Sequence, residues 1–127
     1  MRLWLDDLRP APDGYIWIKS VRDAQRVIEM CEYNAQWFSD RAYEMDRDGR
    51  FEFADRMGKA CHDNIIELID CDHDLGDYAA YGGEGVKLLD WLEETGRDYP
   101  IRIHSQNPVG VANMRRIIQR NGWKEVL

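Results

Sequence analysis

Short apolar runs typical of β-strands alternate with helical patterns along the sequence, and this order constrains the fold more than any other feature. The strand-like runs fall at four places: residues 2–6, 15–18, 65–71 and 101–105. The helical patterns, marked by apolar residues at intervals of three and four, begin at Ser20 and cover residues 84–95 and 109–121. Strands that alternate with helices are typical of an α/β layered fold with a largely parallel sheet. We therefore expect an α/β domain.

Residues 35–63 interrupt this alternation. They contain two further helical stripes, which are separated by the turn-like sequence DRDGR at residues 46–50. We expect a helical hairpin, inserted between the first helix and the strand at residues 65–71. At 127 residues the chain is best described as one domain, residues 1–127, with this insertion inside it.

The charge of the chain excludes one class of function. Its 24 acidic and 17 basic residues give a formal net charge of −7. A protein that coats long stretches of nucleic acid needs a basic surface, whereas a small phosphate ligand or a single RNA end needs only a local site. No segment has the roughly 20 apolar residues that cross a bilayer, and the N-terminus becomes acidic at Asp6, so we expect a cytoplasmic protein without a membrane partner.

Three cysteines, at positions 31, 61 and 71, form no C-x-x-C pair. Their odd number and the expected reducing compartment favour reduced core residues over a disulfide framework or a zinc site.

Polar residues gather where three of the predicted strands end. These clusters are Asp6-Asp7, Asp72-His73-Asp74 and His104-Ser105. Parallel sheets bind their ligands beyond the carboxyl ends of the strands. We therefore expect the three clusters to meet in one site.

Four of these residues are carboxylates: Asp6, Asp7, Asp72 and Asp74. Since Asp72 and Asp74 are two apart, they point the same way on an extended backbone. Converging carboxylates repel one another unless they share a cation, and their hard oxygen atoms suit Mg²⁺ or Mn²⁺. The alternative is that these acids cap helices or form ion pairs with arginines, namely Arg9, Arg102 or Arg115.

Two of the three histidines, His73 and His104, belong to the same clusters. Near neutral pH, two imidazoles that face one phosphate can share the roles of general base and general acid. The alternative is that each is a structural group whose hydrogen bonds are satisfied inside the fold.

The turn HSQNPVG at residues 104–110 leads into the last helix. Backbone N–H groups at a helix N-terminus attract anions, and Ser105 and Asn107 add further polar groups. Ordinary helix capping explains the same residues equally well.

Four segments together resemble a known family. They are LDDLRPAPDG (5–14), DHDLG (72–76), GGEGVKLLDWLEE (82–94) and HSQNPVGVANM (104–114). Their order over residues 2–30 and 65–120 is similar to that of the cyclic-phosphate processing receiver domain, a variant of the response-regulator receiver fold. The resemblance implies a flavodoxin-like, three-layer α/β sandwich with an acidic metal pocket. It also implies the processing of cyclic phosphates, such as 2′,3′-cyclic ends of damaged RNA, and a phage or bacterial source.

The resemblance assigns roles to individual residues. Asp6 and Asp7 match the acidic pair of receivers, and Asp72 and Asp74 flank the position of their phospho-acceptor. Ser105 matches the hydroxyl residue that follows the fourth strand. The remaining matches are features of the variant family: His73, His104, Asn107 and Asn113. No fifth strand is expected to deliver the lysine of ordinary receivers, because Lys124 lies too near the end of the sequence.

These observations predict a metal-dependent phosphoesterase that acts on a cyclic phosphate of a nucleotide or an RNA end. The four aspartates would hold Mg²⁺ or Mn²⁺, and the two histidines would move protons. Arg9, Ser105, Asn107 and Asn113 would bind the phosphate. The alternative is a non-catalytic module that binds a nucleotide or a protein, with residues 35–63 as the surface for a protein partner. A signalling receiver is less favoured because the lysine is absent.

Overall fold

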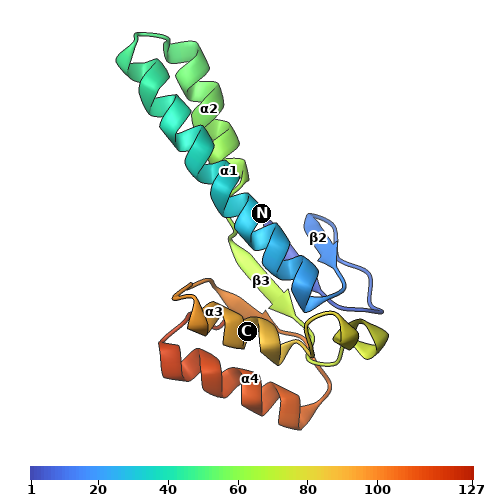
Figure 1. The fold of residues 1–127 in the computed structure, drawn as a ribbon. Coiled ribbons are helices and arrows are strands. Elements are labelled where there is room, and N and C mark those ends of the chain that lie inside the picture. Colours follow the sequence, from blue (N-terminus) through green and yellow to red (C-terminus); the bar gives the residue numbers. More distant parts are fainter.

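A four-stranded parallel sheet forms the centre of the protein, and the computed structural model describes all residues 1–127 (Figure 1). Its strands are β1 (Arg2–Leu5), β2 (Tyr15–Ile18), β3 (Leu68–Cys71) and β4 (Ile101–Ile103). They are ordered β2-β1-β3-β4, and all three neighbouring pairs are parallel. The predicted receiver-like α/β fold is confirmed.

The helices are α1 (Val21–Arg47), α2 (Phe51–Asp63), α3 (Val86–Glu94) and α4 (Pro108–Asn121), together with a short 3₁₀-helix, η1 (Gly76–Ala80). Helix α1 begins where the sequence predicts, since Ser20 Oγ accepts a hydrogen bond from the N–H of Asp23 at 3.1 Å. Helix α4 ends at Gly122, which adopts φ = 67° as its left-handed cap.

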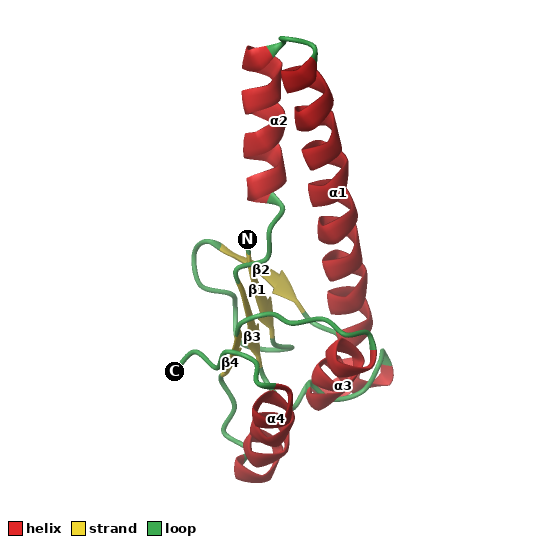
Figure 2. Cartoon of the chain, turned by 90° about the vertical axis from the view of Figure 1, so that its left-hand side faces the viewer, coloured by secondary structure: helices red, strands yellow, loops and turns green.

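The main core lies on one face of the sheet. Alternate residues of β1 and β3, such as Leu3 and Ile69, are buried there against apolar residues of α1, α3 and α4. Figure 2 shows these three helices on the same side of the sheet. The implied three-layer sandwich therefore lacks one helical layer, because only residues 6–14 join β1 to β2 and this segment is too short for a crossover helix. The loop closes over that face, where Trp4 Nε1 donates to the carbonyl of Arg9 at 2.8 Å.

The helical hairpin differs from the prediction in one respect. Its first arm is not a separate helix, because α1 continues without a break from the core to Arg47. Residues 21–47 contain neither glycine nor proline, so nothing in the sequence ends the helix after the core. Helices α1 and α2 project together from the sheet (Figure 1), and Ala54 is the one buried residue between residues 32 and 63. No helix has the combination of length and apolar character that would let it cross a membrane.

The last residues extend the sheet beyond β4, where the sequence predicted no fifth strand. Ile101 donates its N–H to the carbonyl of Lys124 at 2.9 Å and accepts from the N–H of Val126 at 2.8 Å. Ile101 and Glu125 form an isolated parallel bridge. Because Ile101 is the first residue of β4, Lys124 lies at the end of the strand opposite to the polar clusters.

The hairpin is expected to be dispensable for folding. Replacing residues 35–63 with a short Gly/Ser linker removes one buried residue, and each halving of a loop's length changes its closure entropy by only about 0.6 kcal/mol. The truncated protein should therefore unfold in urea in a single cooperative transition. Loss of that transition would show that the hairpin is part of the folding core.

Candidate functional site

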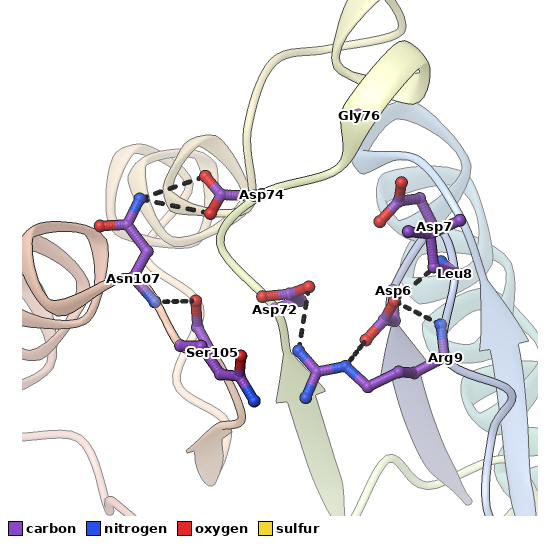
Figure 3. Close-up of a pocket in the computed structure, with 10 residues that line it drawn as sticks. Asp6, Asp7, Leu8, Arg9, Asp72, Asp74, Gly76, Ser105 and Asn107 are labelled. Atoms are coloured by element: carbon purple, nitrogen blue, oxygen red, sulfur yellow. Dashed lines mark hydrogen bonds and ion pairs between the residues drawn. The ribbon is translucent and has the colours of Figure 1, made fainter.

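A pocket of about 430 Å³ lies beyond the carboxyl ends of β1, β3 and β4 (Figure 3). Ten residues line it: Asp6, Asp7, Leu8, Arg9, Asp72, Asp74, Gly76, Ser105, Gln106 and Asn107. They come from the loops that follow these three strands. The polar clusters that the sequence predicts to converge therefore meet at one edge of the sheet, although neither histidine is among the lining residues.

Asp6 is the most constrained carboxylate of the pocket, with 1% of its surface exposed. Its Oδ1 accepts hydrogen bonds from the backbone N–H groups of Leu8 at 2.9 Å and Arg9 at 2.8 Å. Burial opposes ionisation, but these two bonds, the His104 ring and the Arg9 charge together lower the pKa of Asp6 below its ordinary value. Asp6 is therefore a fixed anion at neutral pH.

Asp7 and Asp72 complete a group of three carboxylates. One oxygen atom from each of Asp6, Asp7 and Asp72 lies within 4.8 Å of the others. Asp72 is buried and accepts from the backbone N–H of His73 at 2.8 Å, whereas the carboxylate of Asp7 has no hydrogen bond or ion pair. Three hard oxygen ligands that leave positions open to solvent fit Mg²⁺ or Mn²⁺.

Arg9 partly neutralises this group. Its Nε lies 3.1 Å from Asp6 Oδ2, and its Nη2 lies 3.4 Å from Asp72 Oδ2 and 3.2 Å from the carbonyl oxygen of His104. The arginine pairing considered from the sequence therefore occurs at Arg9. The other two arginines pair elsewhere: Arg102 is nearest to Asp70, at 3.9 Å, and Arg115 pairs with Glu125.

The ring of His104 lies between two carboxylates, Asp6 and Asp70. Its Nε2 is 3.0 Å from Asp6 Oδ2, its Nδ1 is 2.6 Å from Asp70 Oδ1, and its face stacks on Trp4 with the ring centroids 3.7 Å apart. Each ring nitrogen therefore has a carboxylate oxygen as its hydrogen-bond partner. Because both nitrogens are occupied, His104 has no free atom with which to move a proton at a phosphate.

The carboxylates around the pocket outnumber the arginines that pair with them. Four carboxylates belong to this connected group: Asp6, Asp7, Asp70 and Asp72. Arg9 pairs with Asp6 and Asp72, and Arg102 lies 3.9 Å from Asp70, whereas the carboxylate of Asp7 has no paired base. An unpaired carboxylate beside two others agrees with a cation site.

Asp74 does not join the other three aspartates, although it lines the pocket. Figure 3 shows it on the far side, where Asn107 Nδ2 donates to it at 3.2 Å and 3.3 Å. His73 Nδ1 lies 2.9 Å from its Oδ1, and that bond, with the one from Asn107, lowers the pKa of Asp74 against a small effect of burial. The chain bends at His73, so the alternation expected of an extended backbone stops after Asp72.

The ring of His73 packs against helix α4. A Cβ atom added to Gly110 would lie 2.4 Å from His73 Cγ, so the glycine provides the space for the imidazole. With Nδ1 directed at Asp74, His73 contacts a carboxylate that lines the pocket. The structure thus brings His73 and His104 next to the pocket but not into its lining, and it does not direct both rings at one ligand.

The polar turn before α4 caps this helix and also forms part of the pocket surface. Asn107 Oδ1 accepts from the N–H of Gly110 at 3.0 Å, and Ser105 Oγ accepts from the N–H of Asn107 at 3.2 Å. Both residues also line the pocket. Asn113 does not, because it lies two turns further along α4, where it accepts from Arg116 at 3.3 Å.

Asp70 is the residue that the sequence analysis missed. It is fully buried in β3, and its Oδ2 has no hydrogen-bond partner. A carboxylate inside an aliphatic strand is costly without a counter-charge, so the run LIDC was a usable signal. Glu84 was also missed; it anchors the loop after β3 by accepting from the N–H of Leu75 at 2.8 Å.

The comparisons with known proteins support one family. The family model of the cyclic-phosphate processing receiver domain matches residues 50–120, more than half of the chain. The matched range contains the loops after β3 and β4, but not Asp6 or Asp7. Neither the curated proteins nor the solved structures gave a significant match. The chain belongs to the cyclic-phosphate processing receiver domain family.

Proposed function

We propose that this protein is a metal-dependent phosphoesterase that opens a cyclic phosphate. The observation that supports this most is the group of three carboxylates, Asp6, Asp7 and Asp72, whose oxygen atoms lie within 4.8 Å of one another beside Arg9. A cation site next to an arginine, in a member of this family, is suited to a phosphate ester.

The three carboxylates would hold Mg²⁺ or Mn²⁺. When bound, such a cation stabilises negative charge on phosphoryl oxygens and activates a water molecule. Arg9, now bonded to Asp6 and Asp72, would be released from them to bind the phosphate, for which a planar guanidinium is well suited. Ser105 and Asn107 line the same pocket and would contact the remaining phosphate oxygens.

The histidines would act through carboxylates. His104 is a positioning residue, because it holds Asp6 by one ring nitrogen and Asp70 by the other. His73 bonds through Nδ1 to Asp74, which lies in the pocket; because its pKa is lowered, this carboxylate would stay ionised and accept a hydrogen bond from a water molecule opposite the cation. Asn107 fixes the orientation of Asp74 from the other side.

A second function is binding of the same ligand without turnover. It is favoured by the absence of both imidazole rings from the pocket lining, since opening a phosphodiester requires proton transfer. The two functions share the cation site and the phosphate site, and only the measurement of product separates them.

A hydrolysis screen tests both functions. The protein is incubated with Mg²⁺, Mn²⁺ or EDTA and with 2′,3′-cyclic, 3′,5′-cyclic and linear nucleotides, and product is followed by chromatography while affinity is measured by calorimetry. Metal-dependent product that is lost in Asp72→Asn, but kept in the exposed control Asp77→Asn, supports the phosphoesterase. Binding without product supports the second function, and neither binding nor product contradicts both.

Magnesium is expected to stabilise the fold. A ligand at 100 times its dissociation constant adds about 2.7 kcal/mol to the free energy of unfolding, which for a domain of this size raises Tm by roughly 10 °C. Asp7→Asn and Asp72→Asn should remove most of this rise, whereas Asp48→Asn in the turn of the hairpin should keep it. An unchanged Tm of the wild type in millimolar Mg²⁺ would show that Arg9 alone balances the acids.

A further inference from the structure

A strip of aromatic and basic side chains borders the pocket on the side of β2. It consists of Trp17 and Lys19 at the end of β2, Arg22 in the first turn of α1, and Tyr78 and Tyr81 in and after η1. Figures 1 and 2 both show the segment after Gly76 beside the first turn of α1, and Arg22 donates its N–H to the carbonyl of Tyr81 at 3.0 Å. We call these five residues the aromatic–basic strip.

The three rings of the strip are accessible to solvent. Trp17, Tyr78 and Tyr81 are 39%, 38% and 52% exposed. The Lys19 ammonium lies 4.5 Å from the ring centroid of Trp17 and 5.8 Å from that of Tyr78, and the Arg22 guanidinium lies 5.9 Å from that of Tyr81. The strip therefore presents ring faces and cations together.

Two hollows lie on either side of Tyr78. One, of about 510 Å³, follows the free edge of β2 from Ile16 to Lys19 and is mainly apolar. The other, of about 380 Å³, lies between Arg22, Arg26 and Tyr81. The second hollow is lined mainly by polar residues, and Asp23 lines both. Hollows of this size are typical of small-ligand sites.

The strip is connected to the acidic pocket. Trp17 Nε1 donates to the backbone carbonyl of Asp6 at 2.7 Å, so the indole is fixed to the residue that anchors the carboxylate group. On the other side, a Cβ atom added to Gly76 would lie 2.5 Å from Asp7 Oδ2, and Tyr78 follows this glycine two positions later. A ligand with its phosphate in the pocket would therefore meet the strip as it leaves.

The cations of the strip are available to a ligand. Lys19 and Arg22 form no ion pair, and the neighbouring Arg26 has only a 3.9 Å contact with Asp23. In a chain of net charge −7, such a local group of unpaired cations beside exposed rings favours an anion that also carries rings.

We propose that the aromatic–basic strip binds the bases and phosphates of a single-stranded oligonucleotide whose terminal phosphate lies in the acidic pocket. The terminal contact rests on the proposed function, but the strip does not. Single strands are bound by aromatic rings on which bases stack and by cations that follow the backbone. The strip supplies both within one continuous surface.

The test compares two probes. A fluorescein-labelled hexaribonucleotide with a 3′-phosphate and the matching mononucleotide are titrated in Mg²⁺, and dissociation constants are measured by anisotropy and calorimetry. The hexanucleotide is expected to bind at least about 10-fold more tightly than the mononucleotide. Tyr78→Leu and Tyr81→Leu should each raise the dissociation constant of the hexanucleotide by about 5-fold or more. The dissociation constant of the mononucleotide should change by less than about twofold.

Salt dependence gives a second readout. Arg22→Gln should reduce the slope of log K against log salt concentration for the hexanucleotide by about 0.7, the amount expected for one contact with a single strand. The matched controls are Tyr43→Leu and Arg47→Gln, which alter exposed residues of the same types on the hairpin. Urea unfolding of each variant shows that the fold is intact.

The outcomes separate the two proposals. If the mononucleotide does not bind but the hexanucleotide binds and depends on Tyr78, the proposed function fails and the strip stands. If the mononucleotide binds and the hexanucleotide is no tighter, the strip is overturned while the proposed function stands. The strip is also overturned if the hairpin controls lose as much affinity for the hexanucleotide as the strip variants do. It is overturned as well if the strip variants leave that affinity unchanged, which is the result that a protein-binding surface would give.

Discussion

Replacing His104 with glutamine is expected to lower the free energy of unfolding by about 3–5 kcal/mol. The reason is that His104 lies between Asp6 and Asp70, both of which are nearly inaccessible to solvent. Removing the ring takes a hydrogen-bond partner away from two buried carboxylates at once, and each buried acceptor that loses its partner costs about 1–3 kcal/mol, or more where it is charged. Glutamine also loses the stacking of the imidazole on Trp4.

Urea denaturation of the purified variants measures this loss. Asp70→Asn should be milder than His104→Gln, because it keeps the ring in place and leaves its bond to Asp6 intact. His62→Gln is the control, since His62 is exposed on α2. A loss below about 1 kcal/mol in His104→Gln would show that the ring does not stabilise the two buried carboxylates.

His104 and Asp70 are also expected to affect cation binding, because the ring of His104 connects Asp70 to Asp6. Groups that orient a metal ligand typically change metal affinity or activity by 10- to 100-fold when they are replaced. Asp70→Asn, which should fold, is therefore expected to weaken the Mg²⁺-dependent rise in Tm, although Asp70 does not line the pocket. Its effect would distinguish a positioning role from a purely structural one.

The sequence predicted where the site lies, but it did not predict which of the site's residues contact one another. Parallel strands deliver their carboxyl ends to one edge, so the convergence of the loops after β1, β3 and β4 depends only on topology. Which carboxylates meet depends on the path of each loop. The bend at His73, where the carbonyl accepts from Gly85 N–H at 2.7 Å, separates Asp74 from Asp72, and no spacing rule in the sequence contains it.

Periodicity also failed to identify the continuous α1 helix. Its core stripe ends at Cys31, and the half-buried residues Phe38 and Met45 lie further along α1, which there packs beside α2. A change of packing partner produces the same pattern as the start of a new helix. The absence of glycine and proline from residues 21–47 was the better indicator.

The structure makes a second large prediction at the start of α3. Replacing Gly85 with alanine is expected to lower the free energy of unfolding by about 3 kcal/mol or more. A Cβ atom at this position would lie 1.9 Å from the carbonyl oxygen of Asp72 and 3.2 Å from the Cα of His73. Because these obstacles are backbone atoms, no side-chain rotation relieves them, and overpacking of this kind costs up to 3 kcal/mol or more.

Two other glycines provide matched controls in helices. Gly58→Ala in α2 meets no atom within 4 Å, so it should stabilise the protein by about 0.5–1 kcal/mol through helix propensity alone. In Gly110→Ala the three atoms nearest to the new Cβ belong to the ring of His73, a side chain and not backbone, so it should cost less stability than Gly85→Ala and disturb the bond to Asp74. Urea midpoints should therefore rank Gly58→Ala first, Gly110→Ala second and Gly85→Ala last. If Gly85→Ala were as stable as Gly110→Ala, the loop after β3 would be free to shift, and the carboxylate group that it supports would not be rigid enough to select a cation.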